Sequence, residues 1–211
     1  MTVTSVDKEA DPDVLHIGLS DGSSFFMRLS CLAVLPGSSA DVEDGDLSVG
    51  VVLDEDSEGR LRLAGSVYKA ERNALQLIAL SEQSTAGLNL KLQKKGIDSQ
   101  VRALVLSRLL ASGLLDDERF ASLWLASRIR RKTEGRVRLV AGLRKRGVSG
   151  SVADRVVSRE LDFDTEASLV RRYLASAGID HGPLEPKVRK ALHEAGFSGA
   201  AVRLALDNGN G

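Results

Sequence analysis

The sequence feature that most constrains the fold is a four-residue pattern that occurs three times along the chain. It consists of a predicted helix end, a glycine, an apolar residue and a helix-capping residue, at Lys95-Gly96-Ile97-Asp98, Arg146-Gly147-Val148-Ser149 and Ala195-Gly196-Phe197-Ser198. The glycines are 51 and 49 residues apart, and a leucine precedes each of them by four positions. Glycine readily adopts the left-handed conformation that ends a helix, and Asp or Ser caps the helix that follows. The pattern therefore predicts a tandem helical repeat.

Helical spacing of apolar residues begins near Tyr68 and continues to the C-terminus, which predicts a mainly α fold. The repeat divides this part of the chain into three three-helix repeats, at residues 66–113, 114–162 and 163–211. A trio of short helices buries little apolar surface alone, so neighbouring repeats are expected to stack on one another.

Residues 1–65 have a different pattern, in which apolar residues alternate with other residues. Leu15, Ile17 and Leu19 alternate in this way, Asp21-Gly22 suits a turn, and the alternation then resumes, which predicts a β-hairpin. A weaker alternation on both sides of an acidic segment ending at Gly59 predicts a second hairpin between Val49 and Leu63. We therefore expect an acidic β-hairpin extension at 1–65 that docks on the helices, because two short hairpins are not stable alone.

The formal net charge is zero, but the charges are unevenly distributed along the chain. Residues 1–66 contain 13 acidic and four basic residues, whereas residues 67–211 contain 16 acidic and 25 basic residues. Between residues 119 and 159 there are 12 basic residues, ten of them arginine, against Glu134 and Asp154. Such an asymmetry is typical of a nucleic-acid contact surface or of a chain with an acidic partner.

Nine of these basic residues gather around two predicted helix ends and one predicted helix start. The expected partner- and DNA-binding residues are Arg128, Arg130, Arg131, Lys132, Arg136, Arg138, Arg144, Lys145 and Arg146. Cations at helix C-termini are favoured by the helix dipole, so a solvated surface is the alternative interpretation. That alternative does not account for Arg136 and Arg138 at a helix start, and the planar guanidinium suits phosphate.

No catalytic, metal or cofactor site is predicted. The sequence has no Walker loop and no Gly-x-Gly-x-x-Gly after a strand, and His16, His181 and His193 lack partners at ligand spacing. The acidic stretch Asp54–Gly59 imitates half of a calcium loop, but Gly65 stands where the loop needs a bidentate Glu, so we interpret it as a hairpin turn. The single cysteine, Cys31, and the lack of a signal peptide or long apolar segment predict a cytoplasmic, non-membrane protein.

The segment Gly113–Ala121 looks like a paired-acid site but is better interpreted as a helix start. Asp116 or Asp117 would cap the new helix, and Glu118 would favour its positive end. Phe120 and Trp124, four positions apart, are expected to fill the core on one face of that helix.

These residues resemble the RecX family of recombination regulators, which modulate the RecA recombinase. The resemblance covers about residues 67–207 and is most specific at Gly113-Leu114-Leu115-Asp116-Asp117-Glu118-Arg119-Phe120-Ala121. It continues in Ser127-Arg128, in Gly135-x-x-Arg138-Leu139-x-x-x-Leu143-x-x-Arg146-Gly147-Val148, in Glu166-Ala167 and in Gly196-Phe197-Ser198. The chain departs from the family at Val49–Leu53, where such extensions often continue as a helix, and at Gly182-Pro183 and Pro186 in the third repeat.

The resemblance implies a non-enzymatic protein with its three repeats in an elongated, curved array. It further implies binding to the RecA–single-stranded-DNA filament and suppression of ATP hydrolysis, strand exchange and repressor cleavage, in homologous recombination, DNA repair and the SOS response. We expect a monomer without cofactors that also binds duplex DNA weakly. The alternative is a sequence-specific DNA-binding regulator, because short helices joined at glycine turns imitate a helix-turn-helix.

Overall fold

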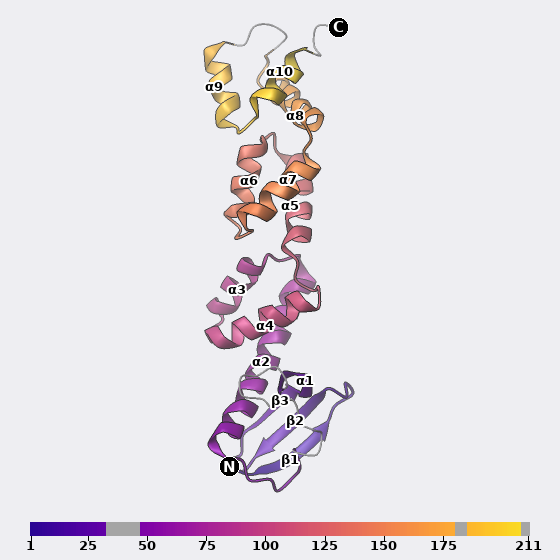
Figure 1. Cartoon of the computed structure of the whole chain (residues 1–211), viewed down its shortest axis with the longest axis vertical. Coiled ribbons are helices and arrows are strands. Elements are labelled where there is room, and N and C mark those ends of the chain that lie inside the picture. Colours follow the sequence, from indigo (N-terminus) through magenta and orange to yellow (C-terminus); the bar gives the residue numbers. More distant parts are fainter. Residues whose placement is uncertain (33–46, 180–184, 208–211) are drawn as a thin grey trace. The chain divides into compact units, whose positions relative to one another are not determined.

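The computed structural model describes residues 1–32, 47–179 and 185–207 and is mainly helical with a small N-terminal β-sheet, as predicted (Figure 1). The chain forms two compact units. The N-terminal unit comprises residues 1–81 and 88–114, and the C-terminal unit comprises residues 82–87 and 115–211. No helix among the described residues is long and apolar enough to cross a membrane.

The sheet has three antiparallel strands in the order β1-β2-β3: β1 (Val3–Lys8), β2 (Val14–Leu19) and β3 (Ser24–Arg28). The predicted first hairpin is confirmed as β2 and β3, in which Ile17 pairs with Phe25. Its turn contains Gly22 at φ 83°, a conformation that few other residues adopt. Strand β1 was not predicted, because the sequence Val-Thr-Ser-Val-Asp-Lys has no regular apolar alternation.

The predicted second hairpin is wrong, because residues 55–63 belong to the long helix α2 (Glu55–Leu80). The Asp54 carboxylate accepts a hydrogen bond from the Ser57 N–H at 2.8 Å, and three acidic residues in the first turn favour the positive end of the helix. The acidic stretch interpreted as a hairpin turn is therefore a helix start. Before it, Val51 and Leu53 are extended and bond to the first residues of the chain, with the Val3 N–H donating to the Val51 carbonyl at 3.0 Å.

The other helices are short. Their bounds are α1 (Leu29–Leu32), α3 (Thr85–Lys94), α4 (Ser99–Ala111), α5 (Asp117–Arg131), α6 (Arg136–Arg144), α7 (Gly150–Glu160), α8 (Phe163–Ser176), α9 (Pro186–Glu194) and α10 (Gly199–Asp207). Helices α2 to α10 thus follow one another in three sets of three. The bounds of the three predicted repeats stay a prediction.

The predicted glycine turns are confirmed. Gly96, Gly147 and Gly196 have φ of 75°, 81° and 85° and follow α3, α6 and α9. After each one, the N–H of the apolar residue donates to the carbonyl of the leucine five positions earlier, at 3.3, 3.2 and 3.2 Å. This is the hydrogen bond of a Schellman helix end. Pro186 is compatible with α9 because it occupies the first turn, where its missing N–H has no helical partner; Gly182 and Pro183, like His181, lie outside the described residues.

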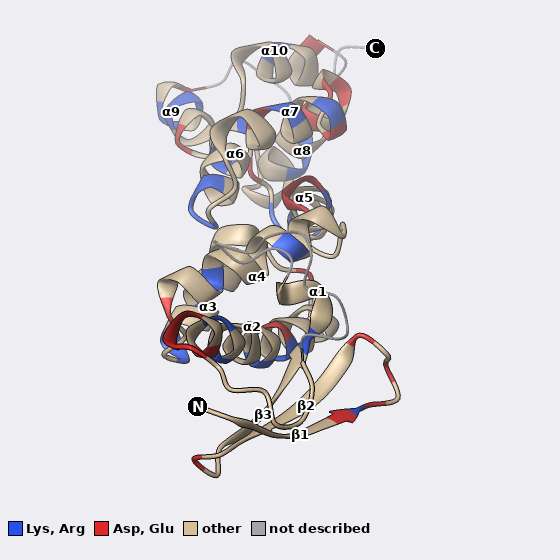
Figure 2. Ribbon diagram, turned by 60° about the horizontal axis from the view of Figure 1, so that its bottom comes forward, with Lys and Arg blue, Asp and Glu red and all other residues tan. Residues whose placement is uncertain are grey.

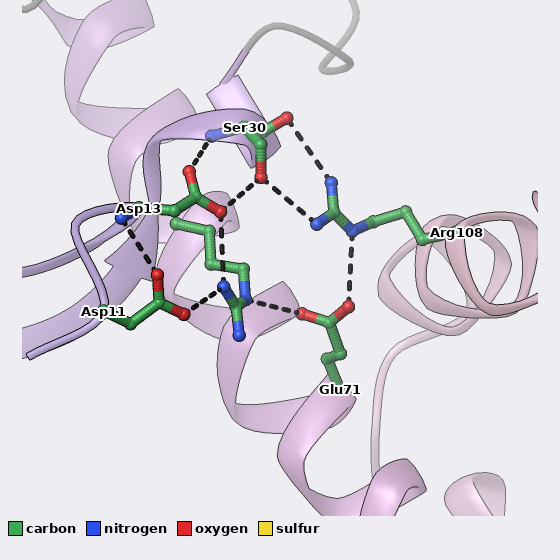
Figure 3. A network of polar contacts seen from close by, with 6 residues as sticks. Asp11, Asp13, Ser30, Glu71 and Arg108 are labelled. Atoms are coloured by element: carbon green, nitrogen blue, oxygen red, sulfur yellow. Dashed lines mark hydrogen bonds and ion pairs between the residues drawn. The ribbon is translucent and has the colours of Figure 1, made fainter. Parts of the chain in front are cut away.

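Helix α2 lies against β3, and a charged network fastens the sheet to α2 and α4 (Figures 1 and 3). Arg28, at the end of β3, contacts Asp11 at 2.8 Å, Asp13 at 3.3 Å and Glu71 of α2 at 3.4 Å. Arg108 of α4 contacts the other Glu71 oxygen at 3.5 Å and reaches the Ser30 hydroxyl at 3.3 Å. One connected set of polar groups therefore links four elements of the N-terminal unit.

Asp13 accepts more hydrogen bonds than any other carboxylate in this network. Its two oxygens accept the backbone N–H and the hydroxyl of Ser30 at 2.8 and 2.7 Å. Partial burial alone would raise the pKa of Asp13, but the Ser30 hydrogen bonds and the Arg28 guanidinium outweigh it and hold the pKa below its usual value. A carboxylate with a lowered pKa stabilises the fold above its unfolded-state pKa, and this stabilisation is lost as the pH falls through the folded-state pKa.

Acid should therefore loosen the docking of the sheet below about pH 4. Cys31, fully buried in α1 beside Ser30, is the only cysteine of the chain and can report this opening through its reaction with a pyridyl disulfide. We expect Asp13→Asn to raise the reaction rate at neutral pH by roughly fivefold, as for the loss of about 1 kcal/mol of hydrogen bonding, and to remove the increase at low pH. Asp7→Asn removes the same charge from an exposed residue of β1 and should do neither; equal effects of the two variants would contradict the role of Asp13.

Candidate nucleic-acid interface

All nine predicted basic residues lie on two consecutive helices of the C-terminal unit or directly after them (Figure 2). Helix α5 ends at Arg131 with Lys132 as its C-cap, and α6 runs from Arg136 to Arg144 with Lys145 as its C-cap. The position of the α6 side chains on this surface depends on how the N-terminus of α6 is held.

The N-terminus of α6 lies against the glycine turn between α9 and α10. The Gly135 N–H donates to the Ala195 carbonyl at 2.9 Å, and the Val137 N–H donates to the Gly196 carbonyl at 3.1 Å. A Cβ atom on Gly135 would lie 2.2–2.3 Å from backbone atoms of Gly196 and Phe197. Only glycine permits this approach of two backbones, so position 135 fixes how closely the turn docks on α6.

A buried carboxylate replaces the missing side-chain cap of α6. Glu166 of α8 is fully buried, and its Oε1 accepts the N–H of Arg136 at 3.1 Å and the N–H of Ser198 at 3.0 Å. Its Oε2 accepts the Ser198 hydroxyl at 2.8 Å. One carboxylate therefore caps the first turns of α6 and α10 together, where the positive ends of both helices favour its charge.

The same arrangement recurs at the N-terminus of α3. The Thr85 N–H donates to the Asp117 carboxylate at 2.8 Å, and the Ser84 hydroxyl donates to the Arg146 carbonyl at 2.7 Å. A Cβ on Gly147 would lie 2.2 Å from the Ala86 Cβ. A glycine turn and a carboxylate thus hold the first turn of α3 as they hold the first turn of α6.

Four of the nine predicted basic residues have partners within the chain. Arg128 forms a bidentate ion pair with Glu134, with both contacts at 2.7 Å, and this carboxylate raises the pKa of Arg128. Arg136 donates to the Leu161 carbonyl and, at 3.1 Å, to the Ser158 hydroxyl. Arg144 pairs with Asp154 at 3.6 Å, and Arg146 donates to the Gly142 carbonyl at 2.9 Å. For Arg128 and Arg136, these contacts give the side chain a structural role in addition to any binding role.

The other five predicted residues are exposed, and their side chains make no hydrogen bond or ion pair with any residue that the structure describes. They are Arg130, Arg131, Lys132, Arg138 and Lys145. We call this set the unpaired basic residues. Their charges are available to an external anion, and their use in binding stays a prediction.

Part of the basic surface surrounds Trp124, in a pocket of about 520 Å³ lined by Trp124, Arg128, Glu134, Arg138, Gly142, Lys145 and Arg146. Trp124 was expected to fill the core, and it does pack against the core of this unit, but it is only partly buried. The guanidinium carbons of Arg146 and Arg128 lie 4.8 and 5.9 Å from the centre of its ring. Sequence reasoning missed this second role, because nothing in the spacing of Trp124 and Arg146 brings them together.

The acidic segment at the start of α5 is a helix start, as expected. Asp116 is the N-cap and accepts the N–H groups of Glu118 and Arg119 at 2.8 and 3.1 Å. Asp117 caps α3 instead, and Glu118 contacts Arg155 and Arg159, which hold its pKa below its usual value. Each carboxylate therefore has a structural partner.

The sequence of this chain also matches proteins of one known family. A profile described as "RecX, second three-helix domain" matches residues 116–157, inside the range 114–162 predicted for the second repeat. "Regulatory protein RecX" of Halorhodospira halophila is 37% identical over 146 residues, which cover 67% of this chain and 89% of that protein. The chain belongs to the RecX family. The RecX protein of Treponema pallidum strain Nichols is 32% identical over 153 residues, covering 72% of this chain and 92% of that one.

Two solved RecX structures share the fold. The crystal structure of a regulatory protein RecX aligns with a TM-score of 0.73 over 98% of both chains at 19% identity. RecX from Lactobacillus salivarius aligns with a TM-score of 0.60 over 68% of this chain and 96% of its own, at 15% identity. The RecX relatives are named regulatory proteins rather than enzymes.

Gly135→Ala should destabilise the C-terminal unit of this RecX-family chain. The new methyl group meets backbone rather than a movable side chain, so we expect the free energy of unfolding to fall by about 1–3 kcal/mol. Urea unfolding followed by the fluorescence of Trp124, the only tryptophan, measures this loss. Gly199→Ala is the matched control, since its Cβ would meet nothing nearer than 3.7 Å; equal stability of the two variants would contradict the close backbone approach.

Glu166→Ala should destabilise the same unit by about 2–4 kcal/mol, because it leaves two helix-terminal N–H groups and a hydroxyl without their acceptor. Glu166→Gln keeps a carbonyl acceptor, so its free energy of unfolding should fall by less than that of Glu166→Ala. The same unfolding experiment applies, with Asp164→Ala on the exposed side of α8 as control, expected to cost less than about 1 kcal/mol. A Glu166→Ala variant as stable as this control would show that the two caps contribute little.

Proposed function

We propose that this chain regulates the RecA recombinase by binding the RecA–single-stranded-DNA filament and suppressing its ATP hydrolysis, strand exchange and repressor cleavage. Membership of the RecX family supports the regulatory role. The observation that carries the proposal is the set of unpaired basic residues on α5 and α6 or directly after them, which are exposed, have no intramolecular partner among the described residues and are available to an external anion.

The proposed contact is between these side chains and the phosphate backbone of the filament's DNA. Each phosphate neutralised by Lys or Arg releases counterions. For a single strand, each such contact therefore lowers the logarithm of the binding constant by about 0.7 for every tenfold rise in salt concentration, and we call this dependence the salt slope. Three of the five unpaired residues are arginine, whose planar fork suits a phosphate. Contacts of this kind depend little on base sequence.

In this mechanism a rigid basic surface bridges neighbouring subunits of the filament and competes with incoming duplex DNA. We propose that the protein acts as a monomer in the cytoplasm, in recombination, repair and the SOS response, and that it binds free duplex DNA only weakly. A sequence-specific DNA-binding regulator would behave differently, because a specific site is bound about 10³-fold or more tightly than other DNA.

The test removes only residues without a structural partner. The quadruple variant Arg130→Ala, Arg131→Ala, Arg138→Ala and Lys145→Ala should keep the fold and lose at least tenfold in inhibition of the RecA ATPase on single-stranded DNA. Its affinity for single-stranded DNA should depend less on salt, with a slope reduced by about 3, from four lost contacts.

The matched control removes four exposed cations that lie on α3 and α9 or directly after α3: Lys94→Ala, Lys95→Ala, Lys187→Ala and Arg189→Ala. It changes the net charge equally and should inhibit as the unmodified protein does. Full inhibition of the RecA ATPase by the folded quadruple variant would contradict the role of the basic surface. An equal loss of inhibition in the quadruple variant and the control would show that only the net charge matters.

A further inference from the structure

The pocket beside Trp124 is a basic hollow of the C-terminal unit that also offers an aromatic ring. Its volume of about 520 Å³ falls in the range of small-molecule sites, roughly 300–1,000 Å³. It is therefore larger than a phosphate group requires and can accept a whole nucleotide.

The charge of the pocket is positive. Glu134 is the only acidic residue in its lining, and both of its oxygens are bound by Arg128, so this pair is neutral as a whole. Arg138, Lys145 and Arg146 remain, and the first two have no partner among the described residues. A single phosphodiester group has the charge and the acceptor oxygens to bind between Arg138 and Lys145.

Another part of the lining offers a flat surface. The Arg146 guanidinium lies over the Trp124 ring at 4.8 Å, and its hydrogen bond to the Gly142 carbonyl, at 2.9 Å, holds it there. Gly142 itself permits the ring to lie close to α6, since a Cβ at that position would be 2.6 Å from the Trp124 Cη2. Arg146 remains exposed, and nucleobases stack both on aromatic rings and on guanidinium planes.

We propose that this pocket binds one nucleotide of single-stranded DNA, with the phosphate on Arg138 and Lys145 and the base stacked on the Arg146–Trp124 pair. The inference rests on the proposed function, which places single-stranded DNA at this surface. It adds that the basic surface engages a base as well as the backbone, at one defined position.

The test uses the full chain without RecA and two independent readouts. Binding of a labelled ten-nucleotide oligo(dT) is followed by anisotropy, and contact with the pocket is followed by the emission of Trp124, the only tryptophan of the chain. We expect oligo(dT) to change the emission with the same saturation curve as the anisotropy. An abasic oligonucleotide of equal length should bind more weakly by roughly 5- to 100-fold, since it cannot stack.

Two variants separate the parts of the pocket. Arg138→Ala with Lys145→Ala should weaken oligo(dT) about tenfold or more and lower the salt slope by about 1.4, for two lost phosphate contacts. Arg146→Ala should remove most of the difference between oligo(dT) and the abasic strand. Lys94→Ala with Lys95→Ala, the same loss of charge at the end of α3 and directly after it, should change neither readout.

Three results would overturn the inference. If anisotropy reports binding while the Trp124 emission stays constant, DNA binds outside the pocket; the proposed function still stands if the quadruple variant, which also removes Arg130 and Arg131, loses this binding. If the abasic strand binds as tightly as oligo(dT), the surface takes phosphate alone. If neither strand binds while the RecA ATPase is still inhibited, the pocket does not bind a nucleotide and regulation proceeds through contacts with RecA itself.

Discussion

The buried carboxylate of Glu166 determines how the helices of the C-terminal unit are arranged around the basic surface. A charged group without water must have its hydrogen bonds satisfied, and here the acceptors of one side chain serve the first turns of α6 and α10. The positive ends of both helices meet at this charge, so neither helix can shift without leaving a buried charge or a buried N–H unpaired. The glycine contact between positions 135 and 196 then allows the two backbones to touch.

This arrangement occurs twice, at α3 and at α6, as a tandem repeat would require. Asp117 and Glu166 come from the first helices of two consecutive predicted repeats, and each caps the middle helix of the repeat before it. Gly147 and Gly196, the helix-ending glycines, are also the points of close approach to that middle helix. At these two positions one glycine both ends a helix and docks the turn on its neighbour, whereas a Cβ on Gly96 would meet nothing within 4 Å, so Gly96 only ends its helix.

The turns and caps could be predicted from the sequence because they depend on residues a few positions apart. Gly96, Gly147 and Gly196, the Asp116 cap and the β2–β3 hairpin all follow local rules and are confirmed. The start of α2 could not be predicted in the same way, because Val49–Leu63 alternates like a strand while Asp54 and the acids after it act as a helix start. The choice is made by distant contacts, in which Val51 and Leu53 bond to the N-terminus and Leu61 enters the core of the unit. The roles of Glu166 and Trp124 also depend on residues that meet only in the folded chain.

The basic cluster also depends on contacts that form only in the folded chain. The number of basic residues in the sequence therefore overstates the number of cations without an intramolecular partner. Of the 12 basic residues between 119 and 159, several neutralise acids that lie outside that range: Arg119 contacts Glu82, and Arg155 and Arg159 contact Glu118. Others are paired inside it, as Arg128 is with Glu134. The unpaired basic residues that remain are five, and if each met one phosphate of a single strand the salt slope would be about −3.5. The paired arginines have a structural role: Arg155 and Arg159 hold α7 to α5, and Arg128 holds the loop between α5 and α6, so the unpaired residues lie on helices of fixed position.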